Sequence, residues 1–339
     1  MTKARNARLQ VFYNKTDLST DLKPHLLSWS YTDNLSGQAD DLQLTVEDSE
    51  QRWSGSWIPD LSASLQATLF RENWDLDGKI EKLPLGFFEI DEIEVSYPPS
   101  VVSIKAISVP ESSSLRGEKK NKAWEETKLS VIAAEKAKGA GLKLLYDSPE
   151  NPKYDRIEQT DETDIGFLMR LCNDAGLCLK VAGTQLVIFD EAKYENAAPI
   201  ATLERKVSEL KSFRGRTTSI GTYKACRVTY FAGKDEKAIS ATFTPAKAPK
   251  VGRTLNVNER VSSIAEAQLL AKKKLREANK EATQVTITMV GDPRMVAGVT
   301  VNLKRFGAFD GKYIVTQAVH SQQSGYETSL ELRRCLEGY

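Results

Sequence analysis

Alternation of apolar and polar residues in the first third of this 339-residue chain limits its fold more than any other feature. The alternation recurs in five segments, at residues 7–13, 41–47, 63–70, 87–95 and 101–107. A period of two places one face of a strand on a core and the other face in solvent. Turn-forming residues separate the segments, so this region predicts a barrel or sandwich of short strands.

The middle of the chain changes character. Polar residues 110–122 indicate a linker, and helical spacing follows at 126–138. A second helix is expected to begin near Thr163, with Thr163 or Asp164 as its cap. Short strands are predicted at 142–146, 177–182 and 185–189, which makes this region a small α/β domain.

The last third returns to strand patterns. A single helix is predicted at 262–279, where Ser262 or Ser263 together with Glu266 resembles a capping box. The expected strands lie at residues 207–216, 224–231, 238–243, 283–290, 299–305, 312–320 and 326–334.

Two segments share a weak pattern. An aromatic residue follows Gly86 and Gly311 at the second position, and apolar residues follow at the fourth and seventh. Either this is a repeat, or it is the alternation that any two hairpins share. Taken as a repeat, it predicts a mainly β α+β protein with two related antiparallel β-barrel domains flanking the α/β domain. The expected domains are residues 1–110, 111–205 and 206–339.

Composition argues against several functions. The 47 Lys and Arg residues nearly balance the 46 Asp and Glu residues, whereas nucleic-acid binding usually requires a surplus of positive charge. The overall balance still allows a local basic face on the protein. Neither a leader pattern nor an apolar run of about 18 residues occurs, so no membrane insertion is expected. The four cysteines lack a CxxC pair and are expected to be buried free thiols.

Catalytic patterns are weak. His25 and His320 are the only histidines, and no GxSxG, HExxH, GxGxxG or Walker A pattern is present. We therefore predict no catalytic, cofactor or metal site. Two alternatives remain: a cell-wall hydrolase that uses carboxylates, and a carbohydrate-binding protein. The first rests on Asp91, Glu92, Glu94, Asp161, Glu162 and Asp164, and the second on Trp53, Trp57, Trp74, Tyr97 and Trp124.

A set of motifs over about 250 residues resembles the late control protein D family, the baseplate hub proteins of contractile phage tails and related particles. The resemblance includes QTDETDIGFLMRLC at 159–172 and the helix at 262–279. The structural motif residues are Gly86, Phe88, Gly291, Asp292, Pro293, Gly298, Asp310, Gly311, Tyr313, His320, Gly325, Tyr326 and Thr328. We expect positive φ at Gly298 and Gly311, and we expect Pro293 to end strand pairing.

The resemblance implies a structural, non-enzymatic homotrimer without cofactors. Its quasi-six-fold ring would join the tail tube to the central spike and to the end of the tape-measure protein. Other baseplate proteins, including a LysM-type protein, are expected partners, with DNA only as passing cargo. The chain ends at Tyr339, so the spike is expected to be a separate protein. The particle, a virion or a DNA-free tailocin, would be made in the bacterial cytoplasm.

Overall fold

The structure is a computed structural model that describes residues 3–109, 114–231, 238–246, 248 and 252–339. The chain forms two compact units. The first contains Met1–Lys193, Thr288–Gly298 and Thr316–Leu330, and the second contains Tyr194–Ile287, Val299–Val315 and Glu331–Tyr339. Chain segments from the last third therefore complete the first unit.

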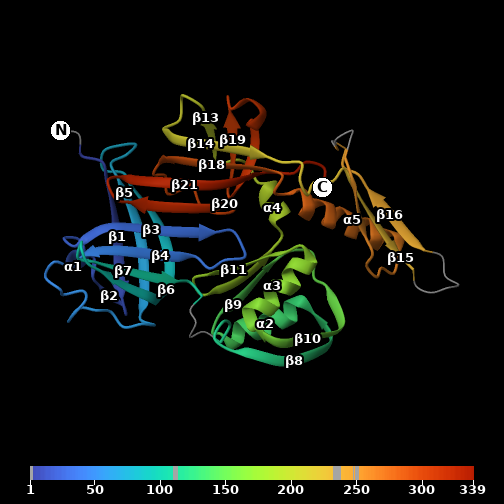
Figure 1. Cartoon of the computed structure of the whole chain (residues 1–339), viewed down its shortest axis with the longest axis horizontal. Coiled ribbons are helices and arrows are strands. Elements are labelled where there is room, and N and C mark those ends of the chain that lie inside the picture. The colour runs from blue at the N-terminus through green and yellow to red at the C-terminus, as the bar shows by residue number, and fades with distance from the viewer. Residues whose placement is uncertain (1–2, 110–113, 232–237, 247, 249–251) are drawn as a thin grey trace. The chain divides into compact units, whose positions relative to one another are not determined.

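The first unit contains a curved antiparallel sheet (Figure 1). Its strand order is β20-β3-β4-β7-β6-β5-β1-β2, in which β20 (Gly311–Gln322) comes from the last part of the chain. Its core includes Leu42, Leu69 and Val102, which are fully buried. The elements are β1 (Asn6–Tyr13), β2 (Thr16–Asp17), α1 (Ser19–Leu22), β3 (Leu26–Asn34), β4 (Asp41–Glu47), β5 (Ser64–Glu72), β6 (Ile80–Ser96) and β7 (Val101–Ile107).

All five strands predicted for this region are present, but the prediction missed β3 and shortened β6. Strand β3 (LLSWSYTDN) was missed because it begins with two adjacent leucines and ends with the buried polar residues Asp33 and Asn34, which interrupt the alternation. In β6 a bulge interrupts the pattern, because the register to β5 shifts between Ala67 and Thr68, opposite Gly86 and Pro84.

The rest of the first unit is the α/β region. Its elements are β8 (Lys119–Lys128), α2 (Leu129–Gly139), β9 (Lys143–Asp147), β10 (Lys153–Thr163), α3 (Asp164–Ala175), β11 (Cys178–Ala182) and β12 (Gln185–Phe189), and α4 (Glu191–Glu195) follows. The two helices share a core with β11 and β12 that includes Ile132, Phe167 and Ile188. Thr163 caps α3, since its side chain accepts a hydrogen bond from Gly166 N.

Two predictions in this region were wrong. Residues 119–122 belong to β8, whereas a linker was expected, and α2 begins at Leu129, whereas 126 was expected. The antiparallel partner β10 explains both errors, because it pairs with the polar residues of β8 up to Lys128, which lies opposite Lys153. Residues 110–113, which include the predicted boundary between the first two domains, lie outside the described residues.

The second unit joins short strands to one long helix. The elements named in this part of the chain are β13 (Ala201–Glu204), β14 (Leu210–Thr217), β15 (Ala225–Tyr230), β16 (Ile239–Phe243), β17 (Thr254–Val257), α5 (Ile264–Asn279), β18 (Thr283–Val290), β19 (Thr300–Lys304), η1 (Gly307–Phe309), β20 (Gly311–Gln322) and β21 (Tyr326–Arg334). Strands β18, β20 and β21 have residues in both units. Helix α5 packs on β15 and β16 through Ala267, Ala271 and Leu275 (Figure 1).

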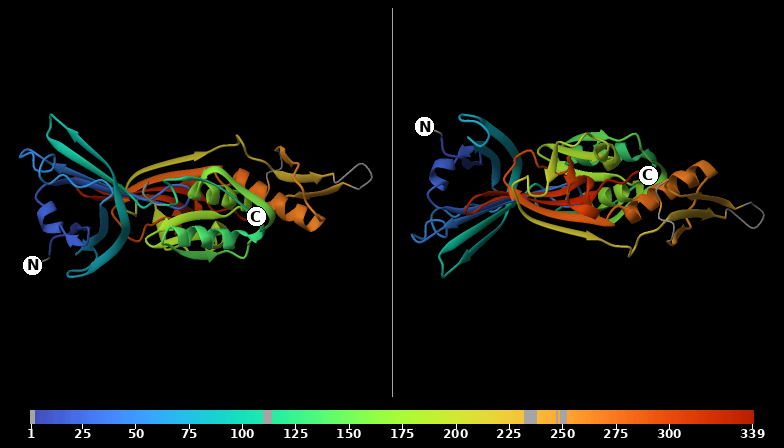
Figure 2. Two further views of the ribbon diagram at one scale, coloured as in Figure 1. Left: turned by 90° about the horizontal axis from the view of Figure 1, so that it is seen from below. Right: turned by 90° about the horizontal axis from the view of Figure 1, so that it is seen from above.

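The mainly β character is as predicted, but no sheet formed by the described residues closes into a barrel. In the first unit β2 ends the strand order without meeting β20, and in the second unit β14 is a terminal strand. Beyond Ser64, the first residue of β5, strand β6 continues and pairs with β7, and both strands are drawn in teal in Figure 2. The repeat glycines also differ, because Gly86 lies inside β6 and Gly311 begins β20, although both have positive φ.

Candidate functional site

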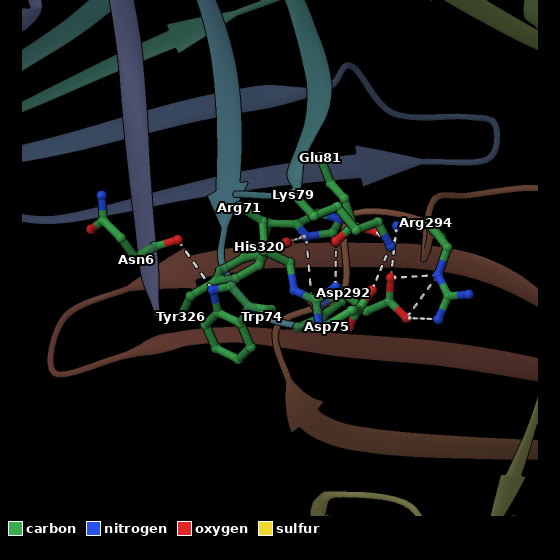
Figure 3. Close-up of polar contacts among 11 residues, drawn as sticks. Asn6, Arg71, Trp74, Asp75, Lys79, Glu81, Asp292, Arg294, His320 and Tyr326 are labelled. Atoms are coloured by element: carbon green, nitrogen blue, oxygen red, sulfur yellow. Dashed lines mark hydrogen bonds and ion pairs between the residues drawn. The ribbon is translucent and has the colours of Figure 1, made fainter. Parts of the chain in front are cut away.

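The motif residues Asp292, His320, Tyr326 and Thr328 lie together in the first unit, and the imidazole of His320 is fully buried. Figure 3 labels three of them, Asp292, His320 and Tyr326. His320 Nε2 lies 2.9 Å from the Met295 carbonyl oxygen, and Nδ1 lies 2.7 Å from the Tyr326 hydroxyl. A carbonyl only accepts hydrogen bonds, so Nε2 carries the proton and Nδ1 accepts from Tyr326. Burial lowers the pKa of His320, which keeps the ring neutral. Both ring nitrogens are therefore hydrogen-bonded within the protein, one to the Met295 carbonyl oxygen and one to the Tyr326 hydroxyl.

The Gly291-Asp292-Pro293 motif forms the turn that brings Met295 to this histidine. Met295 N donates to Asp292 O at 3.1 Å, which closes a β-turn with Pro293 at its second position. Asp292 N donates to Thr328 Oγ1 at 3.0 Å, and Gly291 N donates to Tyr326 O at 3.0 Å. The backbone N–H groups of the first two motif residues thus bind the turn to β21.

The Asp292 carboxylate is buried and paired. It accepts hydrogen bonds from Arg294 N at 3.0 Å and from the Arg294 guanidinium at 2.7–3.2 Å. Burial acts to raise the pKa of Asp292, but the Arg294 hydrogen bonds outweigh it and the net pKa is lowered. The negative charge is therefore kept inside the turn.

A second set of charges from β5, β6 and the turn between them lies beside this cluster (Figure 3). Arg71 pairs with Glu81 and lies 3.6 Å from Asp75, and its guanidinium stacks 4.8 Å above the Trp74 ring. Trp74 meets Tyr326 edge-on, with ring centroids 6.2 Å apart. Trp74 thus packs against the Tyr326 ring that holds His320, and Arg71 lies on Trp74.

A third group of charges joins the N-terminal sheet to the α/β region. Lys180 of β11 pairs with Asp33 and lies 3.1 Å from Asp40, and Asp33 also accepts from Ala297 N at 2.8 Å. Burial raises the pKa of Asp40 to about 6, while the positive charge of Lys180 opposes the shift. The Lys180 ammonium group thus forms ion pairs with two buried carboxylates.

The motif Asp310-Gly311-Lys312-Tyr313, which contains the second repeat glycine, lies in the second unit. The buried Tyr313 hydroxyl donates to Phe309 O at 2.9 Å and accepts from Arg334 at 2.9 Å. Asp310 accepts from Phe306 N at 2.6 Å. These contacts hold the turn between β19 and β20 closed.

The other motif residues have local roles. Gly298 and Gly311 have φ of +90° and +139°, which suits glycine at a turn. Phe88 is buried and meets Tyr31 edge-on at 6.0 Å, and Gly325 precedes β21 in an open turn. Sequence reasoning missed Arg71, Glu81 and Lys180, because a single charged residue gives no signal of how little of its side chain is exposed.

The residues considered for chemistry are dispersed. His25 meets Trp53 and Trp57 edge-on at about 6 Å. Trp53 and Trp124 are buried, so they offer no face to a sugar. Asp91, Glu92 and Glu94 are exposed on β6, and Asp164 is buried against Lys120 and Lys136. Among the described residues, no group of three or more His, Cys, Asp or Glu could hold a metal ion.

The cysteines follow the prediction for three positions. Cys172, Cys178 and Cys226 are buried cysteines that form no disulfide, whereas Cys335 is partly exposed. Burial raises the pKa of Cys172 to about 12, which keeps the thiol protonated.

The model of the phage tail baseplate hub family matches residues 104–326, which include the turn, the histidine and most of the strands described above. The chain belongs to this family. It is also 25% identical over 242 residues to a probable baseplate hub protein of Escherichia phage 186. That alignment covers 70% of this chain and 59% of the phage 186 protein, so the chain spans less than two thirds of that relative.

Two solved structures share the fold of this hub-family chain. One is the prophage MuSo2 43 kDa tail protein of Shewanella oneidensis, with a TM-score of 0.72, 14% identity and coverage of 97% of this chain and 99% of that one. The other is the tail protein of Neisseria meningitidis MC58, with a TM-score of 0.69, 16% identity and coverage of 97% of both chains. Among the described residues, no helix has the length and apolar character needed to cross a bilayer.

Proposed function

We propose that this chain is the structural baseplate hub of a contractile phage-type tail. The family match over residues 104–326 is the observation that carries the proposal. The buried cluster around His320 supports it, since its hydrogen bonds and ion pairs are satisfied within the protein and hold distant segments of the chain together. Such a cluster suits a part that bears mechanical load.

In its finer form, the proposal is a homotrimeric ring. The three domains at 1–110, 111–205 and 206–339 would supply two tube-type elements per chain, so that three chains give six positions. The ring would join the tail tube to a separate spike and to the tape-measure end. A LysM-type baseplate protein would be a further partner, and DNA would only pass through. The particle would be a virion or tailocin, and the hub would act without catalysis or cofactor.

The test is the composition of purified particles. Tail particles from a producing strain should contain this chain at the tail tip, seen by electron microscopy with a labelled chain, in three copies per particle by quantitative mass spectrometry. Particles lacking the chain should fail to form a baseplate. A chain that stays monomeric and never enters a particle would contradict the proposal.

A further inference from the structure

The distal part of β6 in the first unit is an open, acidic sheet edge. Strand β5 pairs with β6 only as far as Glu89, with one further pair of backbone hydrogen bonds at Ile90. Beyond that point, β6 pairs with β7 alone among the described residues. Glu92 and Glu94 are exposed on one face of this edge, and Ile93 and Val95 lie on the other. Val95 is 53% exposed.

Strand β14 of the second unit is an open edge with the opposite charge. It pairs with β18 and ends the strand order within the described residues. Arg214 and Arg216 share one exposed face, and no described carboxylate lies within ion-pair distance of either. On the other face Phe213 stacks on Phe306, with ring centroids 4.3 Å apart. Gly215 lies beside Phe309, so a side chain there would clash.

We infer that β14 of one copy adds, antiparallel, to the open edge of β6 in a second copy. In the register that sets Glu94 opposite Arg214, Glu92 falls opposite Arg216, because both pairs are spaced by two residues. On the reverse face Val95 then meets Phe213. Arginine and carboxylate form strong paired hydrogen bonds, and free strand edges supply the backbone bonds of strand addition.

A second copy is the occupant that the charges select. Each chain carries one acidic and one cationic edge, so the contact is head to tail and closes into a ring when the rotation allows. Lysine and arginine on edges also protect strands against aggregation, but that role requires no matching acidic edge. The inference rests on the proposed ring and names the surfaces that would form it.

Charge reversal tests the contact in the full chain. The first variant combines Glu92→Arg and Glu94→Arg, and the second combines Arg214→Glu and Arg216→Glu. The third variant carries all four changes. Self-association is measured by sedimentation across a concentration series. Each single-edge variant should associate at least about tenfold more weakly, since two pairs become repulsive. The four-fold variant should regain most of the lost affinity.

The matched control is Glu125→Arg, an exposed glutamate of β8 that lies 3.8 Å from Arg156. Like the reversals at Glu92 and Glu94, it makes the net charge more positive, but it touches neither edge. It should leave association unchanged. Association that is unaffected by either single-edge reversal, or a four-fold variant that is no better than its parents, would overturn the inference.

Cross-linking inside particles separates this inference from the proposed function. Glu94→Cys and Arg214→Cys are combined with Cys335→Ser, since Cys335 is the partly exposed thiol. Oxidation should convert the hub in particles into covalent multimers, and either new cysteine alone should not. Particles that contain the chain but give no multimers would overturn the edge contact and leave the hub function standing. A chain absent from all particles would instead defeat the hub function.

Discussion

Gly291 lies directly against the ring of Tyr326, so close that a Cβ at position 291 would overlap three ring atoms. The same ring holds His320 through its hydroxyl, and Gly291 N donates to Tyr326 O. The glycine of the Gly-Asp-Pro motif is thus required by an aromatic side chain 35 residues later in the sequence.

Replacement of Gly291 should therefore destabilise the first unit. Gly291→Ala forces the buried Tyr326 ring to move, and overpacking of this kind reduces the free energy of unfolding by about 2 kcal/mol. Chemical denaturation measures the change. Gly325→Ala is the control, because nothing lies within 4 Å of a Cβ there, and equal effects of the two substitutions would disprove the argument.

His320 should make the protein sensitive to mild acid. Burial lowers its pKa below the ordinary 6.5, so the unfolded chain binds the proton more tightly. The stability is complete above pH 6.5 and is lost as pH falls from there toward the folded pKa, by up to about 1.4 kcal/mol per pH unit. Denaturation of His320→Gln at pH 7.5 and 5 should show a smaller acid loss than the unmodified chain. An unchanged pH slope would count against this assignment.

Asp40 should act with the opposite sign. Its folded pKa of about 6 exceeds the ordinary 3.8, so its contribution is complete below pH 3.8 and is lost as pH rises through 6. The stability of Asp40→Asn relative to the unmodified chain should therefore increase between pH 4 and 7. The exposed Asp155→Asn should show no such trend. A pH-independent difference for Asp40→Asn would rule out the raised pKa.

The buried ion pair between Arg333 and Glu195 should be essential to the second unit. The two side chains are 1% and 3% exposed, and Glu195 also lies 2.7 Å from Arg276. Glu195→Gln removes a buried anion from Arg333 and leaves its contact with the exposed Glu281, 3.9 Å away, which reduces stability by about 3 kcal/mol. Glu277→Gln removes an exposed partner of Lys280 and should cost less than about 0.5 kcal/mol. Comparable losses in thermal denaturation would contradict this prediction.

Local patterns carried much of the fold. The expected capping residues act at the start of α5: Ser263 accepts from Glu266 N, and Glu266 accepts from Ser262 N at 2.7 Å, one residue before the cap. Alternation located β1, β4 and β7 to within a residue or two. These features depend on neighbours in sequence, so the sequence contains the whole signal.

The local sequence patterns did not predict which distant strands pair with one another. The polar run at 119–128 is a strand because β10 opposes it. The described part of the chain has no closed barrel, because closure depends on which strands pair at the ends of the sheet. Neither pairing leaves a mark on the local pattern.

The sequence by itself determined the strand-rich character, the three main helices, the hub-family motifs and the balanced charge of this protein. Only the tertiary structure decided that Asp292, His320, Tyr326 and Thr328 share one buried cluster with Arg71 and Trp74 nearby. It alone exposed the acidic edge of β6 and the cationic edge of β14. The physical reason is that burial and strand edges arise from contacts between residues far apart in the chain, whereas periodicity reports only the residues next to one another.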